Sequence, residues 1–488
     1  MTNLTFIKKD PDKAYIGESL WLPKSKVRAE SIKTALEFSV STMSGVDRHV
    51  MWEETSNHIV CPREFLRPVD YPKYGFPFLD LRPEFLEVDF RCNVVPRNEE
   101  QSRALTALLA NDTGILNLAC GKGKTKLSLL KIAQKRVPTL VIVPHGGILS
   151  QWEEAILGDK AKGIGPSLEF PDSMGLIKGQ TFDWKRPITL ALVSTLWMKI
   201  EAGLVPQEMF SYFGLVVYDE VHQIGAPKFS LTARPFLGDK IGLTATVERD
   251  DGLDPIYLYH IGEPFYTDLE QELIPRIYFQ QTPVVLDYEK ARKGDVLNVS
   301  VLRTMLGRDY HGNVYRYYQV KEALDSGRKV LCLSHSIDQL RLFRAMFPGS
   351  GLIIGDTPSE DRMDILRNSQ ICFAIASLGS TGIDDSSLDT LFWLTPFKSK
   401  NTLQQSMGRI QRLNSVKKSP VMVVFEDWST PTLRKLCMNL KSTLRKWDYE
   451  VETCTPTSVP AGLPPQVQQA YDNEFASLPE KGEVDQED

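Results

Sequence analysis

The residues best suited to phosphate chemistry lie in the segment 118–125, Leu-Ala-Cys-Gly-Lys-Gly-Lys-Thr. A glycine-rich turn that ends in Gly-Lys-Thr, between a strand and a helix, presents backbone N–H groups to a phosphate. The flanks suit this arrangement, because residues 114–118 are apolar and residues 126–134 have helical periodicity. We therefore predict that this loop binds ATP through Gly121, Lys122, Gly123, Lys124 and Thr125. Lys124 would contact the β- and γ-phosphate oxygens, and the Thr125 hydroxyl would also bind Mg²⁺.

Two adjacent acids follow a second apolar run, in the segment 215–222, Leu-Val-Val-Tyr-Asp-Glu-Val-His. Ligands of open parallel sheets bind at the carboxyl ends of the strands. We predict that Asp219 holds Mg²⁺ and that Glu220 orients and deprotonates the attacking water, while His222 reports the state of the site to neighbouring segments. An Asp-Glu pair after a strand is also common at a solvated loop, but the upstream phosphate loop favours catalysis.

Two further segments make the pattern more specific: 241–252, Ile-Gly-Leu-Thr-Ala-Thr-Val-Glu-Arg-Asp-Asp-Gly, and 405–412, Gln-Ser-Met-Gly-Arg-Ile-Gln-Arg. In this order, the four motifs resemble those of superfamily 2 DExH-box helicases. The segment 241–252 is most similar to the XPB-like and phage UvsW-like branch. The resemblance implies two tandem RecA-like domains, an ATPase stimulated by nucleic acid, and coupling of the two activities through His222, Thr244 and Thr246.

The resemblance also implies contacts elsewhere in the chain. Adenine recognition is expected from Arg97 and Gln101, although acidic residues replace the usual aromatic residue of this segment. The segments around Val141 and Val193 and the segment 377–384 are expected to contact the sugar-phosphate backbone of nucleic acid. The residues expected to do so are Pro144, His145, Thr195, Ser380, Thr381 and Gly382. His145 stands where the family often has threonine. Asp384 and Gln405 are expected on the nucleotide side.

Arg409 and Arg412 have a physical role that the resemblance sharpens. Negative charge builds up on a departing γ-phosphate, and an arginine from a second domain can stabilise it when the domains close. Two arginines on a solvated helix face are the ordinary alternative. The upstream motifs favour the catalytic role for Arg409 and Arg412.

Length and pattern predict an α/β protein of several domains. The 488 residues exceed what one hydrophobic core usually covers. Apolar strands alternate with helices, which implies parallel sheets with right-handed crossovers, and the pattern returns after residue 271 without a second phosphate loop. We predict an accessory domain over 1–88, an ATP-binding RecA-like domain over 89–270, a second RecA-like domain over 271–450, and an acidic, disordered tail over 451–488.

The charge of the chain is uneven. The tail 451–488 holds eight acids and one lysine, so the remaining residues are close to +2 within a total of −5. Such a tail cannot bury enough apolar surface to fold alone, and a docking site for a recombination or replication protein is the less common interpretation. Seven cysteines without a C-x-x-C pair favour reduced thiols over disulfides or zinc.

Composition also bears on location and assembly. No apolar run reaches the roughly 18 residues of a membrane span, and the N-terminus lacks a leader pattern. We therefore expect no membrane association and a cytoplasmic monomer, in the host cytoplasm if the protein is viral.

The N-terminal region 1–88 is predicted to form a small α+β module, with a helix over 29–38 and a proline-broken stretch over 61–82. Its aromatic and basic residues either belong to its core or form a surface that binds branched or duplex DNA. These residues are Trp21, Trp52, Tyr71, Tyr74, Lys24, Lys26, Arg28, Arg48, Arg63, Arg67 and Lys73. The segment 287–313 is a candidate thumb-like insertion.

Together these features predict an ATP-dependent DNA helicase or translocase that remodels forked, branched or R-loop DNA in recombination, repair or replication. Contacts mainly to sugar and phosphate would give little sequence preference. One alternative is the motor subunit of a restriction or defence complex, although no compact nuclease motif is evident. Another is a switch in which ATP gates binding without strand separation.

Overall fold

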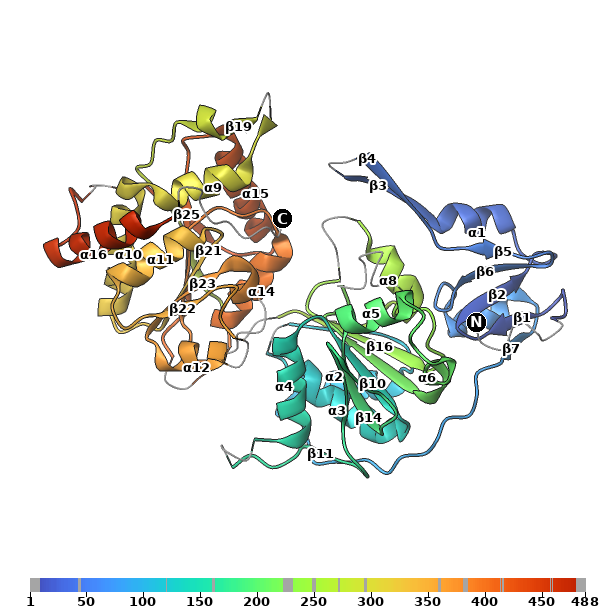
Figure 1. Cartoon of the computed structure of the whole chain (residues 1–488). Helices are drawn as coiled ribbons and strands as arrows, with labels where there is room; N and C mark the ends of the chain where they lie inside the picture. The colour runs from blue at the N-terminus through green and yellow to red at the C-terminus, as the bar shows by residue number, and fades with distance from the viewer. Residues whose placement is uncertain are drawn as a thin grey trace. The chain divides into compact units, whose positions relative to one another are not determined.

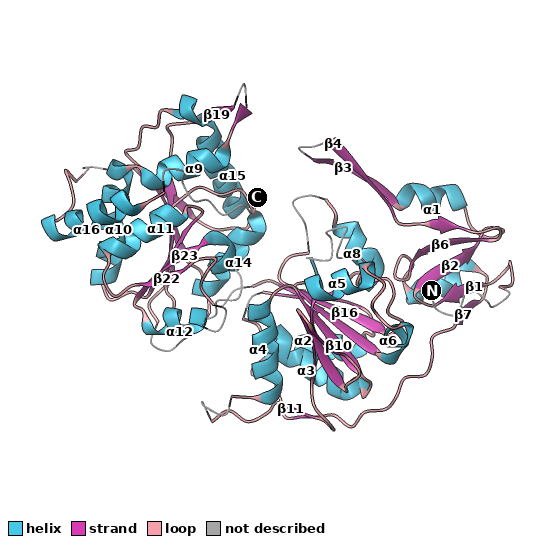
Figure 2. Cartoon of the chain, viewed as in Figure 1, coloured by secondary structure: helices cyan, strands magenta, loops and turns pink. Residues whose placement is uncertain are grey.

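The computed structural model describes residues 9–479, apart from 43–44, 120, 160–162, 223–230, 248–251, 271–272, 294–295, 359–360, 381–384, 413, 415–416, 457 and 459. The chain divides into two compact units, Met1–Leu269 and Glu270–Asp488. Each unit contains a central sheet with helices packed against it (Figures 1 and 2). The alternation of strands and helices expected from the sequence is thus present in both units.

The main sheet of the first unit has eight strands among the described residues, in the order β13-β12-β14-β10-β15-β16-β9-β17. Neighbouring strands are parallel except for β12 and β13. The strands are β9 (Gly114–Leu118), β10 (Thr139–Val143), β12 (Gly175–Lys178), β13 (Thr181–Asp183), β14 (Ile188–Leu192), β15 (Leu215–Asp219), β16 (Asp239–Thr244) and β17 (Pro264–Asp268). Every residue of β10 is buried, as expected for a strand covered on both faces.

Two hydrophobic clusters lie on the two faces of this sheet. Alternate side chains of a strand point to opposite faces, so Val141 belongs to one cluster and Leu140 to the other. The first cluster includes residues of α2 (Glu99–Ala110), α3 (Lys124–Lys135) and α4 (Gly146–Leu157). The second includes residues of α5 (Val193–Glu201), α6 (Gln207–Tyr212) and α8 (Asp254–Ile261). The helices therefore cover both faces and leave the carboxyl ends of the strands for ligands.

The N-terminal module, residues 9–88 of the described chain, has a sheet of five strands in the order β5-β6-β2-β1-β7. The strands are β1 (Ala14–Ile16), β2 (Ser19–Pro23), β5 (Glu53–Glu54), β6 (His58–Pro62) and β7 (Phe78–Asp80). The helix expected over 29–38 is α1 (Ala29–Ala35), which is shorter because β3 (Glu37–Thr42) begins there and forms a hairpin with β4 (Gly45–Val50). The proline-broken stretch holds the short helix η2 (Pro68–Tyr74). A small separate sheet pairs β8 (Arg91–Cys92) with β11 (Leu168–Glu169).

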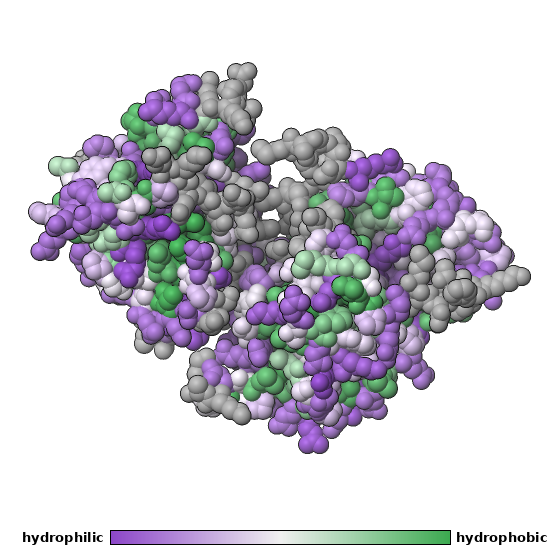
Figure 3. Space-filling model, viewed as in Figure 1, coloured by the Kyte–Doolittle hydropathy of each residue, from purple (hydrophilic) through white to green (hydrophobic). Residues whose placement is uncertain are grey.

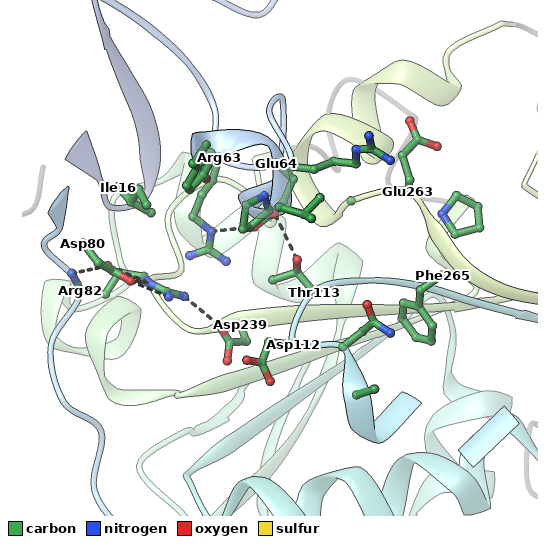
Figure 4. A pocket seen from close by; sticks show the side chains of 18 residues that line it. Ile16, Arg63, Glu64, Asp80, Arg82, Asp112, Thr113, Asp239, Glu263 and Phe265 are labelled. Atoms are coloured by element: carbon green, nitrogen blue, oxygen red, sulfur yellow. Dashed lines mark hydrogen bonds and ion pairs between the residues drawn. The ribbon is translucent and has the colours of Figure 1, made fainter. Parts of the chain in front are cut away.

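A buried arginine joins this module to the main sheet of the first unit. Arg63 is 2% exposed, and its guanidinium donates to the carbonyl oxygens of Leu237 at 2.7 Å and Gly238 at 2.6 Å. It also pairs with Oε1 of Glu64 at 3.1 Å, while Oε2 of Glu64 accepts a hydrogen bond from the Thr113 hydroxyl at 3.1 Å (Figure 4). A cavity of about 590 Å³ lies beside these residues. Arg63 therefore holds the module in place, and it is not part of an exposed basic surface.

Asp239, the first residue of β16, lies between two cations of the same joint. Its Oδ1 accepts from the guanidinium of Arg82 at 2.7 Å, and its Oδ2 pairs with the ammonium of Lys135. Burial alone would raise the pKa of Asp239, but the ion pairs with Lys135 and Arg82 outweigh it and hold the pKa below its usual range. The carboxylate is therefore ionised and paired at neutral pH.

We expect Asp239→Asn to lower the free energy of unfolding by about 2 kcal/mol near pH 7, because Arg82 and Lys135 lose a shared, largely buried partner and keep only the more exposed Asp80 and Asp112. The pKa of Asp239 is lower in the folded than in the unfolded state, so its stabilisation is complete above the unfolded pKa of about 3.9 and is lost as the pH falls through the folded pKa. Urea unfolding of both proteins near pH 7 and near pH 3 measures the effect, and the difference should shrink at the lower pH.

The matched control is Asp183→Asn, which removes a half-exposed carboxylate paired with Arg186 at 3.1 Å. This exposed pair should contribute about 1 kcal/mol or less. If Asp239→Asn and Asp183→Asn cost the same, the joint at Asp239 does not stabilise the unit.

The second unit has a parallel sheet of seven strands among its described residues, in the order β22-β23-β21-β24-β25-β18-β26. The strands are β18 (Arg276–Gln281), β21 (Val330–Ser334), β22 (Gly351–Ile353), β23 (Ile371–Ile375), β24 (Thr390–Trp393), β25 (Val421–Glu426) and β26 (Val451–Cys454). The helices are α9 (Val299–Arg308), α10 (Tyr310–Asp325), α11 (Ile337–Met346), α12 (Asp361–Asn368), α13 (Ala376–Ser380), α14 (Lys400–Ile410), α15 (Pro431–Lys446) and α16 (Pro465–Ser477). The candidate thumb segment forms η5 (Tyr288–Ala291), the short pair β19 (Arg292–Lys293) and β20 (Val296–Leu297), α9, and the start of α10.

The structure corrects the expected start of the unfolded tail at residue 451. β26 adds an edge strand beside β18, and α16 places Tyr471, which is 3% exposed, in a core cluster of the second unit. The rings of Tyr471 and Tyr310 meet edge to face at 5.5 Å. β26 and α16 are ordered because a sheet edge and a core made by other elements receive them, which average charge cannot reveal. The acidic residues 480–488 lie outside the described residues.

The described helices are all too short or too polar to cross a membrane. On the face shown in Figure 3, hydrophilic residues prevail and the hydrophobic ones lie in separate patches.

Candidate nucleotide and nucleic-acid site

The predicted phosphate loop connects β9 to α3, and two of its glycines have a left-handed backbone. Gly121 has φ +83° and Gly123 has φ +88°, values that other residues adopt with strain. A Cβ at Gly123 would also lie 2.7 Å from Nε2 of Gln101. α3 begins at Lys124, and among the described residues no side chain caps it. The N–H groups at the start of α3, including that of Thr125, thus form the helix N-terminus that a phosphate group needs.

The two lysines of the loop have different partners. Nζ of Lys124 donates to the carbonyl oxygens of Leu118 at 2.8 Å and Ala119 at 3.4 Å, and the ammonium has a third N–H for a phosphate. Nζ of Lys122 pairs with Asp268 at 2.6 Å and with Glu100 at 3.3 Å. These acids anchor the side chain of Lys122, and its backbone N–H donates to the carbonyl oxygen of Ala119 at 3.3 Å.

Arg97 and Gln101, predicted to recognise adenine, both contact the phosphate loop. Arg97 donates from Nη2 to the carbonyl oxygen of Gly121 at 3.2 Å. The Gln101 amide donates to the carbonyl oxygen of Lys122 at 3.0 Å and accepts from the backbone N–H of Arg97 at 2.9 Å. Asn98 caps α2 by accepting from the backbone N–H of Gln101 at 2.9 Å. The structure thus brings this segment to the loop, with Gln101 as a brace for its backbone.

The two acids lie at the carboxyl end of β15. Asp219 is the last residue of the strand, and its carboxylate accepts from the indole Nε1 of Trp152 at 2.8 Å and from the backbone N–H of Glu220 at 2.9 Å. Glu220 has φ +47°, a left-handed conformation that costs of order 1–3 kcal/mol in a non-glycine residue and that clusters at functional sites. The strained backbone turns Glu220 away from the course of the strand.

Burial, with a smaller contribution from the Glu220 carboxylate, raises the pKa of Asp219 to about 6. Lys124 opposes this rise only in part, and a divalent metal at these acids would supply further compensating charge. Magnesium is commonly bound by one or two carboxylates together with hydroxyl and phosphate oxygens. Asp219 and the Thr125 hydroxyl fit this donor set. No group of three His, Cys, Asp or Glu side chains suited to a metal occurs among the described residues.

A series of polar contacts leads from the acids to the end of β16. Nδ1 of His222, which is buried, lies 3.5 Å from Oε2 of Glu220 and 3.2 Å from the Thr244 hydroxyl. That hydroxyl donates to the carbonyl oxygen of Thr246 at 2.8 Å and accepts from its backbone N–H at 3.0 Å. The structure therefore brings together the three residues predicted to couple the activities: His222, Thr244 and Thr246.

The predicted nucleic-acid contacts of the first unit differ in exposure. Pro144 follows β10, and His145 is the N-cap residue of α4 and is half-buried. Thr195 is buried, and its hydroxyl accepts the backbone N–H of Gly179 at 3.1 Å. The neighbouring Ser194 is exposed. Thr195 thus already has a structural partner, whereas the side chain of Ser194 is accessible.

In the second unit, Gln405 and Arg409 lie on α14, one turn apart, and Arg412 follows the helix after one more turn. All three are half-buried, whereas Leu403 and Met407 of the same helix are in the core. The backbone carbonyl of Arg412 accepts from Nζ of Lys417 at 2.8 Å. Burial, aided by the charge of Arg412, lowers the pKa of Lys417 to about 8. The carboxylates of Asp389 and Asp385 act on Lys417 in the opposite direction, so Arg412 lies among charges of both signs.

The remaining predictions lie in or next to segments that the structure does not describe. Ser380 ends α13, while Thr381, Gly382 and Asp384 lie outside the described residues. Conversely, sequence reasoning missed Trp152 and Asp268. Trp152 belongs to the segment 141–152, whose resemblance to the family implied nucleic-acid contacts and no contact with Asp219. The strand β17 that ends at Asp268 begins with Pro264, which obscures its pattern.

The comparisons with known proteins agree with this geometry. The family described as "Type III restriction enzyme, res subunit" matches residues 95–249. A protein of Acanthamoeba polyphaga mimivirus, whose name describes an ATP-dependent RNA helicase, is 22% identical over 421 residues, which are 82% of this chain and 77% of that protein. The DNA 3'-5' helicase XPB of Kineococcus radiotolerans is 27% identical over 364 residues, which are 70% of this chain and 62% of the relative.

Among solved structures, Dbp5 of S. cerevisiae bound to RNA and ADP BeF3 has a TM-score of 0.53 at 12% identity, and the match covers 77% of this chain and 93% of Dbp5. At this identity the likeness concerns the fold alone. It confirms the predicted pair of RecA-like domains.

Proposed function

We propose that this chain, which belongs to the superfamily 2 helicases and is an ATP-dependent helicase, moves along DNA and remodels forked, branched or R-loop substrates. The observation that carries the proposal is the chain of contacts from Glu220 through His222 to Thr244. An ATPase without a mechanical task needs only a phosphate loop and the acids. A buried link from those acids to the next strand supports the transfer of the nucleotide state to other parts of the molecule.

In the proposed cycle, the N-terminus of α3 and Lys124 bind the β- and γ-phosphates, and Asp219 with Thr125 holds Mg²⁺. The metal would neutralise charge on the phosphates. Glu220 orients the attacking water and takes its proton. Arg409 and Arg412 stabilise the departing phosphate when the two units close, so that ATP binding and hydrolysis alternate with closure and opening.

DNA is favoured by the likeness to XPB, whereas the mimivirus relative carries an RNA helicase name. The decisive experiment measures ATP turnover with single-stranded DNA, duplex, forked, four-way and RNA–DNA substrates, and with single-stranded RNA, followed by strand displacement on the same substrates. The proposal expects weak turnover alone, strong stimulation by DNA, and displacement of strands from forks. Turnover that responds to no nucleic acid would overturn it.

The family description favours one second candidate, the motor subunit of a restriction complex. That role predicts DNA-stimulated ATP turnover and translocation without displacement of a strand. A purely ATP-gated switch predicts turnover without movement or displacement. A triplex-displacement assay on duplex DNA separates these outcomes, because only a translocating protein removes the third strand. A partner protein for the acidic residues 480–488 is a further part of the proposal.

A further inference from the structure

One hydrogen bond links helix α4 to the predicted metal-binding acid. The indole Nε1 of Trp152 donates to Oδ2 of Asp219 at 2.8 Å. Trp152 is fully buried and belongs to the core cluster that includes Leu149 and Ile156 of the same helix. Its N–H is the one polar group of the side chain, and a buried tryptophan N–H usually has a partner. Here the partner is the acid that the chemistry requires.

The topology explains why a residue in the second turn of α4 reaches the end of β15. β10 and β15 are adjacent and parallel, with Ile142 beside Tyr218, so their carboxyl ends lie at the same edge of the sheet. α4 begins at that edge, directly after Pro144 and His145. Side chains of a helix tilt toward its N-terminus, which directs the indole of Trp152 back to the edge where Asp219 lies.

The same contact leaves the carboxylate available for a metal. Oδ2 accepts from Trp152, and Oδ1 accepts from the backbone N–H of Glu220 at 2.9 Å. Each carboxylate oxygen can accept a second interaction. Two donors from different elements therefore fix the plane of the carboxylate, and a lone pair on each oxygen remains for Mg²⁺.

We infer that Trp152 is a positioning residue that holds the Asp219 carboxylate in its metal-binding orientation. Through the same hydrogen bond, a displacement of α4 would also move that carboxylate. The second part rests on the proposed function, since α4 begins at the expected nucleic-acid contact, His145. Binding of a strand at the N-terminus of α4 would then adjust the metal site through one rigid helix and one hydrogen bond.

The test replaces Trp152 with phenylalanine, and separately with benzothienylalanine, which keeps the size of the indole and puts sulfur in place of the N–H. Binding of a fluorescent ATP analogue is titrated without DNA, in EDTA and across a range of Mg²⁺ concentrations. We expect unchanged affinity in EDTA and a Mg²⁺ requirement raised about 10- to 100-fold, the usual effect of losing an outer-shell partner of a metal ligand. Trp393→Phe, which alters a fully buried tryptophan of the second unit, is the matched control and should change neither value.

The outcomes separate this inference from the proposed function. Equal weakening in EDTA and in Mg²⁺ would mean a general loss of packing and would overturn the positioning role, as would a benzothienylalanine variant with the wild-type Mg²⁺ requirement. DNA stimulation of turnover is then measured at saturating Mg²⁺. A variant stimulated as strongly as the wild type would remove the link through α4. If DNA does not stimulate the wild type either, the proposed function fails while the Mg²⁺ titration still decides the role of Trp152.

Discussion

In the Glu220→Gln variant, ATP should bind with nearly wild-type affinity, while DNA-stimulated turnover should fall by about 10²- to 10⁴-fold, the usual contribution of a general base. Glutamine keeps the shape of the side chain but cannot take a proton from water. The left-handed backbone at Glu220, with φ +47°, places this group away from the course of β15 and next to His222. Turnover measured at saturating ATP and DNA, with binding of a fluorescent ATP analogue, checks both parts.

Two control variants help to interpret this result. Glu153→Gln makes the same change at an exposed position of α4 and should leave turnover unaltered. Lys124→Ala should instead weaken nucleotide binding, because Lys124 is the cation of the phosphate loop. Wild-type turnover in Glu220→Gln would show that another group activates the water.

The nucleotide site could be predicted from the sequence because its determinants are local. Gly121 and Gly123 are needed for left-handed backbone within one turn, and Asp219 and Glu220 follow directly on a short apolar strand. Parallel strands bring such segments to one sheet edge without any further information. Five strands of each sheet followed from the same periodicity, whereas β12, β13, β17, β18 and β26 did not.

The features that the sequence did not predict depend on contacts between distant segments. Arginine is usually a surface residue, but Arg63 is buried by partners, Leu237 and Gly238, that lie more than 170 residues away in the sequence. The structural role of Thr195 could not be predicted for the same reason, because its partner Gly179 lies in a distant segment of the chain. β26 and α16 are ordered by a sheet edge and by a core that other residues build. The composition of a segment indicates whether that segment can fold alone, whereas these segments fold by packing against one another.

Replacing Arg412 with alanine should leave ATP affinity within a few-fold of the wild-type value and lower DNA-stimulated turnover by about 10³-fold, the lower end for an arginine that stabilises a departing phosphate. Arg409→Ala should behave similarly, since Arg409 lies less than one turn before Arg412 on the half-buried face of the α14 region. Single-turnover hydrolysis, with ATP bound before DNA is added, separates this effect from slower product release.

The control for charge is Arg367→Ala, which removes an exposed arginine from α12 of the same unit and should leave turnover unchanged. The comparison matters because Arg412 also lies near Lys417, and their joint positive charge could attract any anion without specificity. A general attraction would make loss of Arg412 weaken ATP binding as much as turnover, whereas a role confined to the transition state lowers turnover alone. Unchanged turnover in both Arg409→Ala and Arg412→Ala would therefore place hydrolysis within the first unit, without a catalytic contribution from α14.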